Sequence, residues 1–145
     1  MNETLKYAGF WRRFAAYTMD SVIIAYALNQ LGGLAWTFFR LITRDYETSQ
    51  EYVAIYLIAL SIPFAWVYFS GMESSPLQAT IGKLAVGLRV TDLQGQRISF
   101  GRATGRFFAK WLSGAILLIG YLMAGFTEKK QALHDRIAGC LVLWK

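Results

Sequence analysis

The sequence has little of the chemistry on which most enzymes and small secreted domains depend. Its 145 residues include one cysteine, one histidine and two prolines, and only 17% of them are charged. Because Cys140 is alone, no disulfide can form within the chain. One histidine and one cysteine also cannot supply the usual zinc ligands. The first ten residues lack the compact apolar core and small-residue cleavage site of a secretory signal, so we expect no cleaved leader.

Catalytic and cofactor motifs are also absent from the sequence. It contains no G-x-S-x-G nucleophile turn and no P-loop. The pair Gly82–Lys83 lacks the spacing of a phosphate-binding loop, and a turn between a helix and a strand explains it better. We therefore expect neither an enzyme nor a bound cofactor.

Apolar residues are abundant: 55% of the chain is hydrophobic, 16% is aromatic and the mean hydropathy is +0.34. A soluble domain of this size needs more polar surface, whereas lipid accepts such a composition. The excess of positive charge lies outside the apolar runs: before residue 14, in residues 71–110 and in the tail from residue 128. This positive-inside pattern predicts a multi-pass cell-membrane protein with a cytoplasmic N-terminus, in contact with membrane lipids and not with nucleic acid.

Two apolar segments are long enough to span a bilayer. Residues 14–39 would reach about 39 Å as a helix, and a bilayer core is about 30 Å thick. Residues 52–70 carry no charge and have aromatic residues near both ends, and Pro63 predicts a kink. The polar connection at residues 40–51 is not positive, so we expect it on the outer side.

A third apolar segment, residues 111–126, is shorter and contains Gly114, Gly120 and Gly125. Two arrangements are open. The segment either crosses the membrane, extended by residues 107–110, or dips in and returns as a re-entrant hairpin broken near a glycine. Re-entry requires that the broken backbone be buried in protein.

The stretch between the second and third apolar segments predicts a strand and a helix. Residues 86–90 alternate and are rich in β-branched types, and the β-prone residues 139–145 could pair with them if both lie on the cytoplasmic side. Ser99 is a good N-cap for the next helix, which we expect in the cytoplasmic interface. On that helix, Gly101, Gly105 and Ala109 form a stripe of small residues suited to close helix contact. The neighbouring stripe consists of three bases that are candidates for lipid headgroups, namely Arg102, Arg106 and Lys110.

These features together predict an all-α integral membrane protein. We expect a small helical bundle of two to three transmembrane segments, an interfacial amphipathic helix and room for a short cytoplasmic β hairpin.

Asp20 lies within the first apolar segment, where a carboxylate is costly. Arg13 and Asp20 share nearly one helix face, but about 10.5 Å of rise separates them, which is too far for a comfortable direct pair. We therefore expect a partner from another helix, such as Arg102 or Arg106. Asp20 is either half of a structural salt bridge or a carboxylate that exchanges a proton or binds a small cation.

The stretch QALHDRIAG contains His134, the only histidine, followed by Asp135. Histidine titrates in the physiological range, so the pair could pass protons at the cytoplasmic mouth. The structural alternative is a short cytoplasmic helix that begins near Thr127 and is closed by Gly139, with Asp135 paired to a base.

Three stretches resemble the RDD family of membrane proteins, named for one arginine and two aspartates. They are YAGFWRRFAAYTMDSVI, QATIGKLAVGLRVTDLQGQRISFGRA and QALHDRIAG, in this order along the chain. The resemblance makes Arg13 the family arginine, with Arg12 as the competing residue. It makes Asp20 the first aspartate and Asp135 the second, with Asp92 as the less favoured candidate.

The resemblance implies one RDD-like membrane domain over residues 1–145 and two hypotheses. Transport of unknown ligands has been proposed for the family, and cation/proton antiport for some members. The first hypothesis is a small-cation/proton transporter for Na⁺ or H⁺, in which Asp20 binds the ion. Arg13 or Arg106 would adjust how readily Asp20 takes up a proton, and Asp135 or His134 would pass protons at the cytoplasmic mouth. This hypothesis requires a homo-oligomer, because two or three transmembrane segments are few for an ion path that opens alternately to the two sides of the membrane. The second hypothesis is a non-enzymatic membrane scaffold or assembly factor with structural Arg–Asp pairs.

Overall fold

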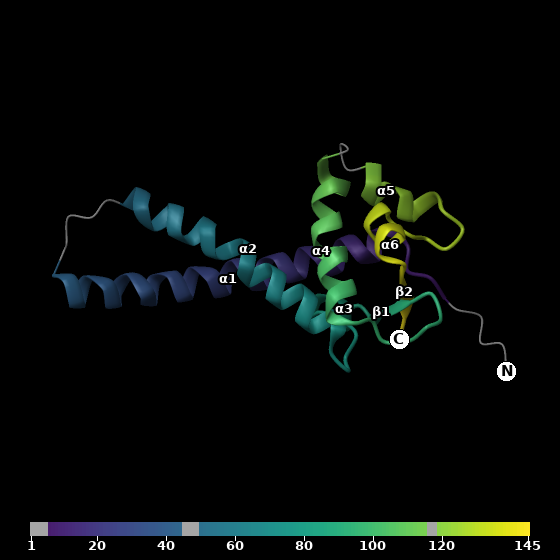
Figure 1. Ribbon diagram of the computed structural model, residues 1–145, viewed down its shortest axis with the longest axis horizontal. Helices are drawn as coiled ribbons and strands as arrows, with labels where there is room; N and C mark the ends of the chain where they lie inside the picture. The colour runs from purple at the N-terminus through teal and green to yellow at the C-terminus, as the bar shows by residue number, and fades with distance from the viewer. Residues whose placement is uncertain (1–5, 45–49, 116–118) are drawn as a thin grey trace. The chain divides into compact units, whose positions relative to one another are not determined.

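The computed structural model describes residues 6–44, 50–115 and 119–145 (Figure 1). The elements in chain order are α1 (Phe10–Thr43), α2 (Gln50–Ser74), α3 (Ile81–Ala85), β1 (Leu88–Asp92), α4 (Phe100–Ala115), α5 (Ile119–Phe126), α6 (Leu133–Ala138) and β2 (Cys140–Trp144). The chain divides into two compact units. Residues 1–20 and 66–145 form the first unit, and residues 21–65 form the second.

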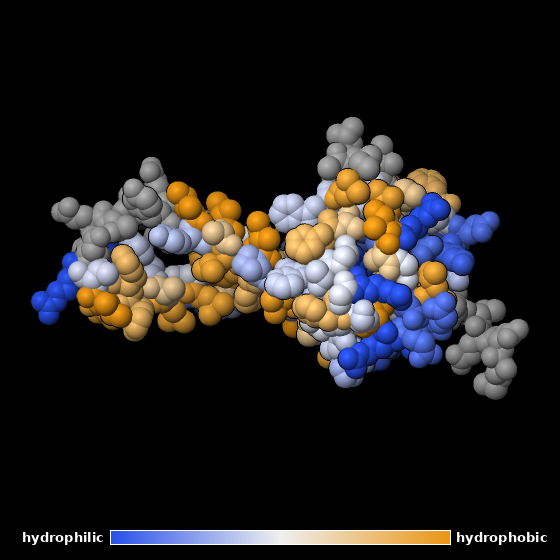
Figure 2. Space-filling view, in the orientation of Figure 1, coloured by the Kyte–Doolittle hydropathy of each residue, from blue (hydrophilic) through white to orange (hydrophobic). Residues whose placement is uncertain are grey.

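The two long apolar segments are helices α1 and α2, as predicted. Two stretches, Phe10–Thr43 and Ile55–Ser74, are long and apolar enough to cross a bilayer, with mean hydropathies of 1.4 and 1.6. Only 6% and 11% of the residues in their most apolar windows are buried, which fits helices that face lipid and not the core helices of a soluble protein. Figure 2 shows the apolar surface of the second unit. The prediction of a helical membrane protein is confirmed.

In the second unit, the two long helices approach closely at a glycine. A Cβ atom on Gly32 of α1 would lie 2.2 Å from Cδ2 of Leu57 in α2. A small residue therefore allows the helices to pack here. Pro63 lies inside α2, where a membrane helix can tolerate a proline, and the kink there stays a prediction.

The first unit contains a two-stranded antiparallel sheet. Strands β1 and β2 pair from Leu88 opposite Trp144 to Asp92 opposite Cys140. The predicted pairing of residues 139–145 with the strand near Val90 is confirmed, and the two strands are connected through α4, α5 and α6. The inner face of the sheet forms a small apolar core with Ile98 and Ala103.

The segment at residues 111–126 folds back on itself. The helix before it, α4, is capped as predicted, because the Ser99 hydroxyl accepts a hydrogen bond of 3.2 Å from the Arg102 amide. A Cβ on Gly120 would lie 2.9 Å from Cα of Ser113, and the Tyr121 hydroxyl donates to the Lys110 carbonyl at 3.2 Å. Seven residues of one straight helix would span about 10.5 Å, so the alternative of a single crossing helix is wrong. Residues 116–118 lie outside the described residues.

Helix α6 packs against α4 and α5 (Figure 1). It ends at Gly139, whose φ of 60° is the left-handed conformation that glycine adopts readily at a helix C-terminus. The predicted cap is therefore confirmed. The helix begins at Leu133, a few residues after the predicted start near Thr127.

Candidate functional site

Arg13, in the first turns of α1, forms an ion pair with Asp135 of α6. The Asp135 side chain is fully buried, and the Arg13 side chain is 12% exposed. Arg13 also donates to the backbone carbonyls of Ala8 at 2.9 Å and Lys130 at 2.6 Å. The guanidinium group therefore joins the start of α1 to the segment that precedes α6. The expectation that Arg13 does not pair with Asp20 is confirmed, as is the expectation that Asp135 pairs with a base.

Arg106 of α4 joins the carboxylates of two other helices. Its Nε donates to Oδ1 of Asp135 at 2.8 Å, and its Nη1 donates to Oε2 of Glu73 in α2 at 2.5 Å. Arg106 is only 2% exposed. Burial disfavours its charged form, but Glu73 and Asp135 outweigh this effect and raise the pKa of Arg106. Arg106 therefore stays protonated and holds α2, α4 and α6 together.

Glu73 pairs with three bases from two helices, α3 and α4. In addition to Arg106, it pairs with Lys83 of α3, and its Oε1 lies 3.7 Å from Nζ of Lys110. Glu73 was not among the residues singled out from the sequence. The sequence feature that could have identified Glu73 is the charge of residues 71–110, which contain six bases and only two acids. An acid in such a basic stretch is a candidate for a buried partner.

His134 and Asp135 are adjacent but have different electrostatic roles. Burial opposes ionisation of Asp135, but Arg106 and Arg13 hold the pKa of its carboxyl well below the usual range. Burial lowers the pKa of His134 to about 3, although Asp135 partly opposes this shift. His134 is therefore neutral at physiological pH, and its Nδ1 lies 3.3 Å from the Ser113 hydroxyl. The ring therefore does not take up a second proton near neutral pH, as the proposed proton step at His134 would need.

Asp20 is fully buried and is held by neutral donors. Its Oδ1 accepts hydrogen bonds from the Tyr68 hydroxyl at 2.7 Å and the Gly82 amide at 2.8 Å. Its Oδ2 accepts one from the Thr80 hydroxyl at 2.5 Å. Because ionised carboxylates are acceptors only, these three donors compensate for its burial.

The expectation that Arg102 or Arg106 pairs with Asp20 is wrong. Arg106 is engaged by Glu73 and Asp135, and the Arg102 side chain is 44% exposed and lies 3.8 Å from Asp92. The physical reason is that the chain after α2 returns to α1 and brings hydroxyl and amide donors to the carboxylate instead of a base.

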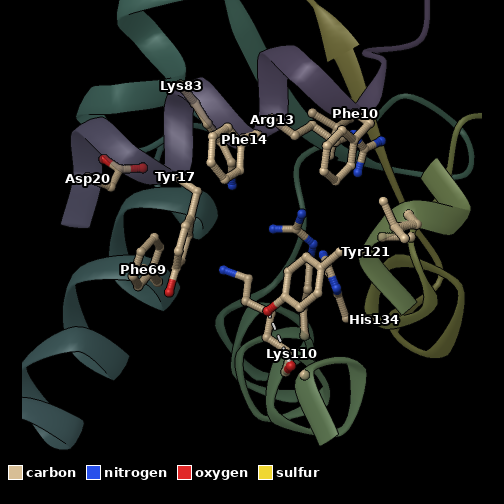
Figure 3. Close-up of a pocket in the computed structure, with 15 residues that line it drawn as sticks. Phe10, Arg13, Phe14, Tyr17, Asp20, Phe69, Lys83, Lys110, Tyr121 and His134 are labelled. Atoms are coloured by element: carbon tan, nitrogen blue, oxygen red, sulfur yellow. Dashed lines mark hydrogen bonds between the residues drawn. The ribbon is translucent and has the colours of Figure 1, made fainter. Parts of the chain in front are cut away.

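A cavity of about 550 Å³ lies in the first unit beside these contacts (Figure 3). Its charged lining residues are Arg13, Asp20, Lys83, Arg106 and Lys110. The rest of the lining is mainly aromatic and aliphatic and includes Phe10, Phe14, Tyr17, Phe69, Tyr121, Leu122 and Val142. Size and lining are typical of a small-molecule site, in which a few polar groups fix a mostly apolar ligand.

The bases of the cavity outnumber the carboxylates that pair with them. Four cationic side chains line the cavity, namely Arg13, Lys83, Arg106 and Lys110. Among the described residues that line the cavity or pair with these bases, the carboxylates are three: Asp20, Glu73 and Asp135.

Among the bases that line the cavity, Lys110 has the longest ion pair: its Nζ lies 3.7 Å from Glu73 and 4.1 Å from the centre of the Phe69 ring. Burial lowers the pKa of Lys110 to about 7, although Glu73 opposes the shift. In Figure 3 its side chain extends from α4 towards Phe69. Lys110 can therefore gain or lose a proton near neutral pH while facing a cavity.

Residues 7–139 match the sequence model of the RDD family. The chain belongs to the RDD family. It is 36% identical to the uncharacterized protein YxaI of Bacillus subtilis, over 97% of this chain and 99% of that protein. It is 29% identical to the uncharacterized membrane protein YteJ of the same organism, over 97% of this chain and 82% of that protein. No solved structure matches the chain.

In this RDD protein the three residues that the resemblance pointed to, Arg13, Asp20 and Asp135, occupy two separate places. Arg13 and Asp135 are joined in the charge network, and Asp20 has its own set of neutral donors. Arg12, the competing arginine, instead stacks its guanidinium 3.5 Å from the centre of the Trp144 ring. The geometry therefore favours Arg13 over Arg12 and Asp135 over Asp92 as members of the buried site.

The three bases of α4 do not form a common lipid-facing stripe. Arg106 is buried, Lys110 is 12% exposed at its side chain, and only Arg102 is largely open. The expected headgroup stripe is wrong for Arg106, because the same helical spacing also suits a face turned towards protein. The small-residue stripe is split in the same way, since Gly101 and Gly105 are exposed and Ala109 is buried.

Metal ligands are not grouped in the part of the chain that the structure describes. Within residues 6–44, 50–115 and 119–145, no three His, Cys, Asp or Glu side chains gather where they could hold a metal ion.

Proposed function

We propose that this RDD protein is a non-enzymatic, proton-linked membrane transporter, and that the transported ion binds in the charged cavity of the first unit. The observation that carries the proposal is Lys110, a weakly paired base that lines a cavity large enough for a small molecule. A group that titrates near the working pH can exchange a proton as its electrostatic surroundings change. An ion that enters the cavity changes those surroundings.

The sequence-based version of this proposal assigned the ion to Asp20, as in cation/proton antiport. Three hydrogen-bond donors point at the Asp20 carboxylate, and a cation would have to replace them. Lys83, which follows Gly82, adds a positive charge to the same wall of the cavity. These contacts favour a structural role for Asp20 and leave proton exchange to Lys110.

Oligomerisation is part of the proposal. The described residues of one chain supply two helices long enough to cross a bilayer, which are few for a path that opens alternately to both sides. We therefore expect a homo-oligomer in the cell membrane, with the N-terminus and the charged unit on the cytoplasmic side.

The test is proton flux in liposomes that contain the purified protein and a trapped pH-sensitive dye. A pH gradient is imposed, and flux is recorded with Na⁺, K⁺ or octyl phosphate as the coupled ion. We expect the wild type to dissipate the gradient with at least one of these ions. Lys110→Met should reduce the rate by about tenfold or more, the equivalent of about 1.4 kcal/mol. The matched control, Arg102→Met, removes an exposed base from the same helix and should keep the rate. Wild-type liposomes that behave like empty ones with every ion would refute transport.

A second candidate is a membrane scaffold or assembly factor. The observation in its favour is that both family aspartates are engaged in internal contacts, Asp20 with three donors and Asp135 with two arginines. In this case Asp20→Asn would lower the folded yield and the recovery of a partner, and the purified protein would be insensitive to Na⁺. Na⁺-dependent stabilisation of the wild type, lost in Asp20→Asn, would count against the scaffold.

A further inference from the structure

We infer that the cavity of the first unit takes an amphiphilic organic anion, a single apolar chain or ring system that carries one carboxylate or phosphate group. The inference rests on the proposed function in one respect: it names the substrate class of the same cavity.

The first argument is the sign of the charge on the cavity wall. Asp20 is the one acid among the described lining residues, and hydrogen-bond donors cover its carboxylate. Glu73 and Asp135 do not line the cavity and are held by the bases that do. An entering ion therefore meets cationic groups, which attract an oxyanion and repel a cation.

The second argument is the location of the unbalanced charge. Lys83 and Arg106 each have a close carboxylate partner, whereas Nζ of Lys110 lies 3.7 Å from a Glu73 oxygen that already pairs with Lys83. An oxyanion next to Lys110 would complete the neutralisation without breaking any of the shorter pairs. Charge-assisted hydrogen bonds of this kind are strong in a site from which water is largely excluded.

The third argument is the apolar remainder of the cavity. Phe10, Phe14 and Leu122 line it as well, and they offer no hydrogen bonds to a fully polar ligand such as free phosphate. Burial of an apolar chain against such side chains is favourable, at roughly 25 cal/mol per Å². A volume of about 550 Å³ suits one short chain better than the two long acyl chains of a phospholipid.

The experiment measures binding of radiolabelled decanoate to the full-length protein in nanodiscs of phosphatidylcholine, with empty nanodiscs as background. Three competitors share an octyl chain and differ in the head group: octyl phosphate, octyltrimethylammonium and octanol. We expect saturable binding that octyl phosphate displaces and the other two do not. Lys110→Met should weaken binding by about tenfold or more, while Lys110→Arg and Arg102→Met retain it. Absence of saturable binding, or equal displacement by the cationic competitor, would overturn the inference.

A second arm distinguishes the source of the anion. Nanodiscs that contain phosphatidic acid present the same phosphate chemistry on a bilayer lipid. Displacement of decanoate by this lipid would support the oxyanion site with a membrane lipid as its occupant, and unchanged binding would support it with a free single-chain amphiphile. Decanoate binding without proton flux would refute transport and leave this inference standing. Na⁺-coupled flux without decanoate binding would support transport and refute the amphiphilic-anion site.

Discussion

Arg13 and Asp135, which are 122 residues apart in the sequence, form a buried ion pair that ties the start of α1 to α6. Arg106 shares the same carboxylate and extends the contact to Glu73 of α2. Four elements of the first unit are thus held by alternating charges, and the cavity lies beside them. The testable consequences concern the fold, the pH dependence and the cavity.

Removal of one partner from the Arg13–Asp135 pair should strongly destabilise the protein. Arg13→Gln leaves Asp135 with one fewer cation, and loss of one partner of a buried pair costs about 3–5 kcal/mol. Arg12→Gln is the matched control, because Arg12 is exposed and stacks on Trp144. The measurement is thermal unfolding in detergent, followed by tryptophan fluorescence. Equal effects of the two substitutions would contradict the assignment of Arg13 to the buried site.

A methyl group at Gly82 should disrupt the support of Asp20. A Cβ there would lie 2.2 Å from the Ala16 carbonyl oxygen and 2.9 Å from the Asp20 carboxyl carbon. The backbone must move, so Gly82→Ala should lower stability by about 1–3 kcal/mol or more. Gly71→Ala is the control, because no atom lies within 4 Å of its Cβ position and alanine suits a helix interior. A Gly82→Ala melting temperature equal to that of the wild type would refute the close approach of α3 to α1.

His134 should make the protein less stable in mild acid. Its pKa is lowered to about 3 by burial, so between that value and about 6.5 the unfolded chain binds a proton that the folded chain does not. Stability therefore falls as the pH drops through this window, by at most about 1.4 kcal/mol per pH unit. The range from about pH 6.5 to about pH 4.5 is informative because most carboxylates stay ionised there. Unfolding curves should show a smaller decline for His134→Asn than for the wild type, and parallel declines would contradict a neutral buried histidine.

The sequence predicted the parts of the fold that depend on local pattern. The long apolar runs identified α1 and α2, the alternation near Val90 identified β1, and Gly139 marked the end of α6. Each of these signals depends on residues close together in the chain. The partner of Val90, Val142, was also foreseeable, because few other segments are β-prone.

The partners of the charged residues could not be predicted in the same way. Helical spacing places Arg106 and Lys110 on one face of α4, but the spacing does not say whether that face meets lipid or protein. Asp20 finds its donors at Thr80 and Gly82, about sixty residues away, and only the return of the chain after α2 brings them together. Glu73 follows an apolar run without any motif, so its three cationic partners emerge only from the packing of α2, α3 and α4.

The central claim is that a weakly paired lysine faces the cavity and titrates near neutral pH. Its direct test is an NMR titration of the nanodisc-embedded protein with ¹³Cε-labelled lysine, in which the Lys110 signal is assigned by its absence from Lys110→Arg. We expect the pKa of Lys110 to be about 7 and to rise when octyl phosphate is added. A pKa near the ordinary lysine value of about 10.4, unchanged by the anion, would contradict the account.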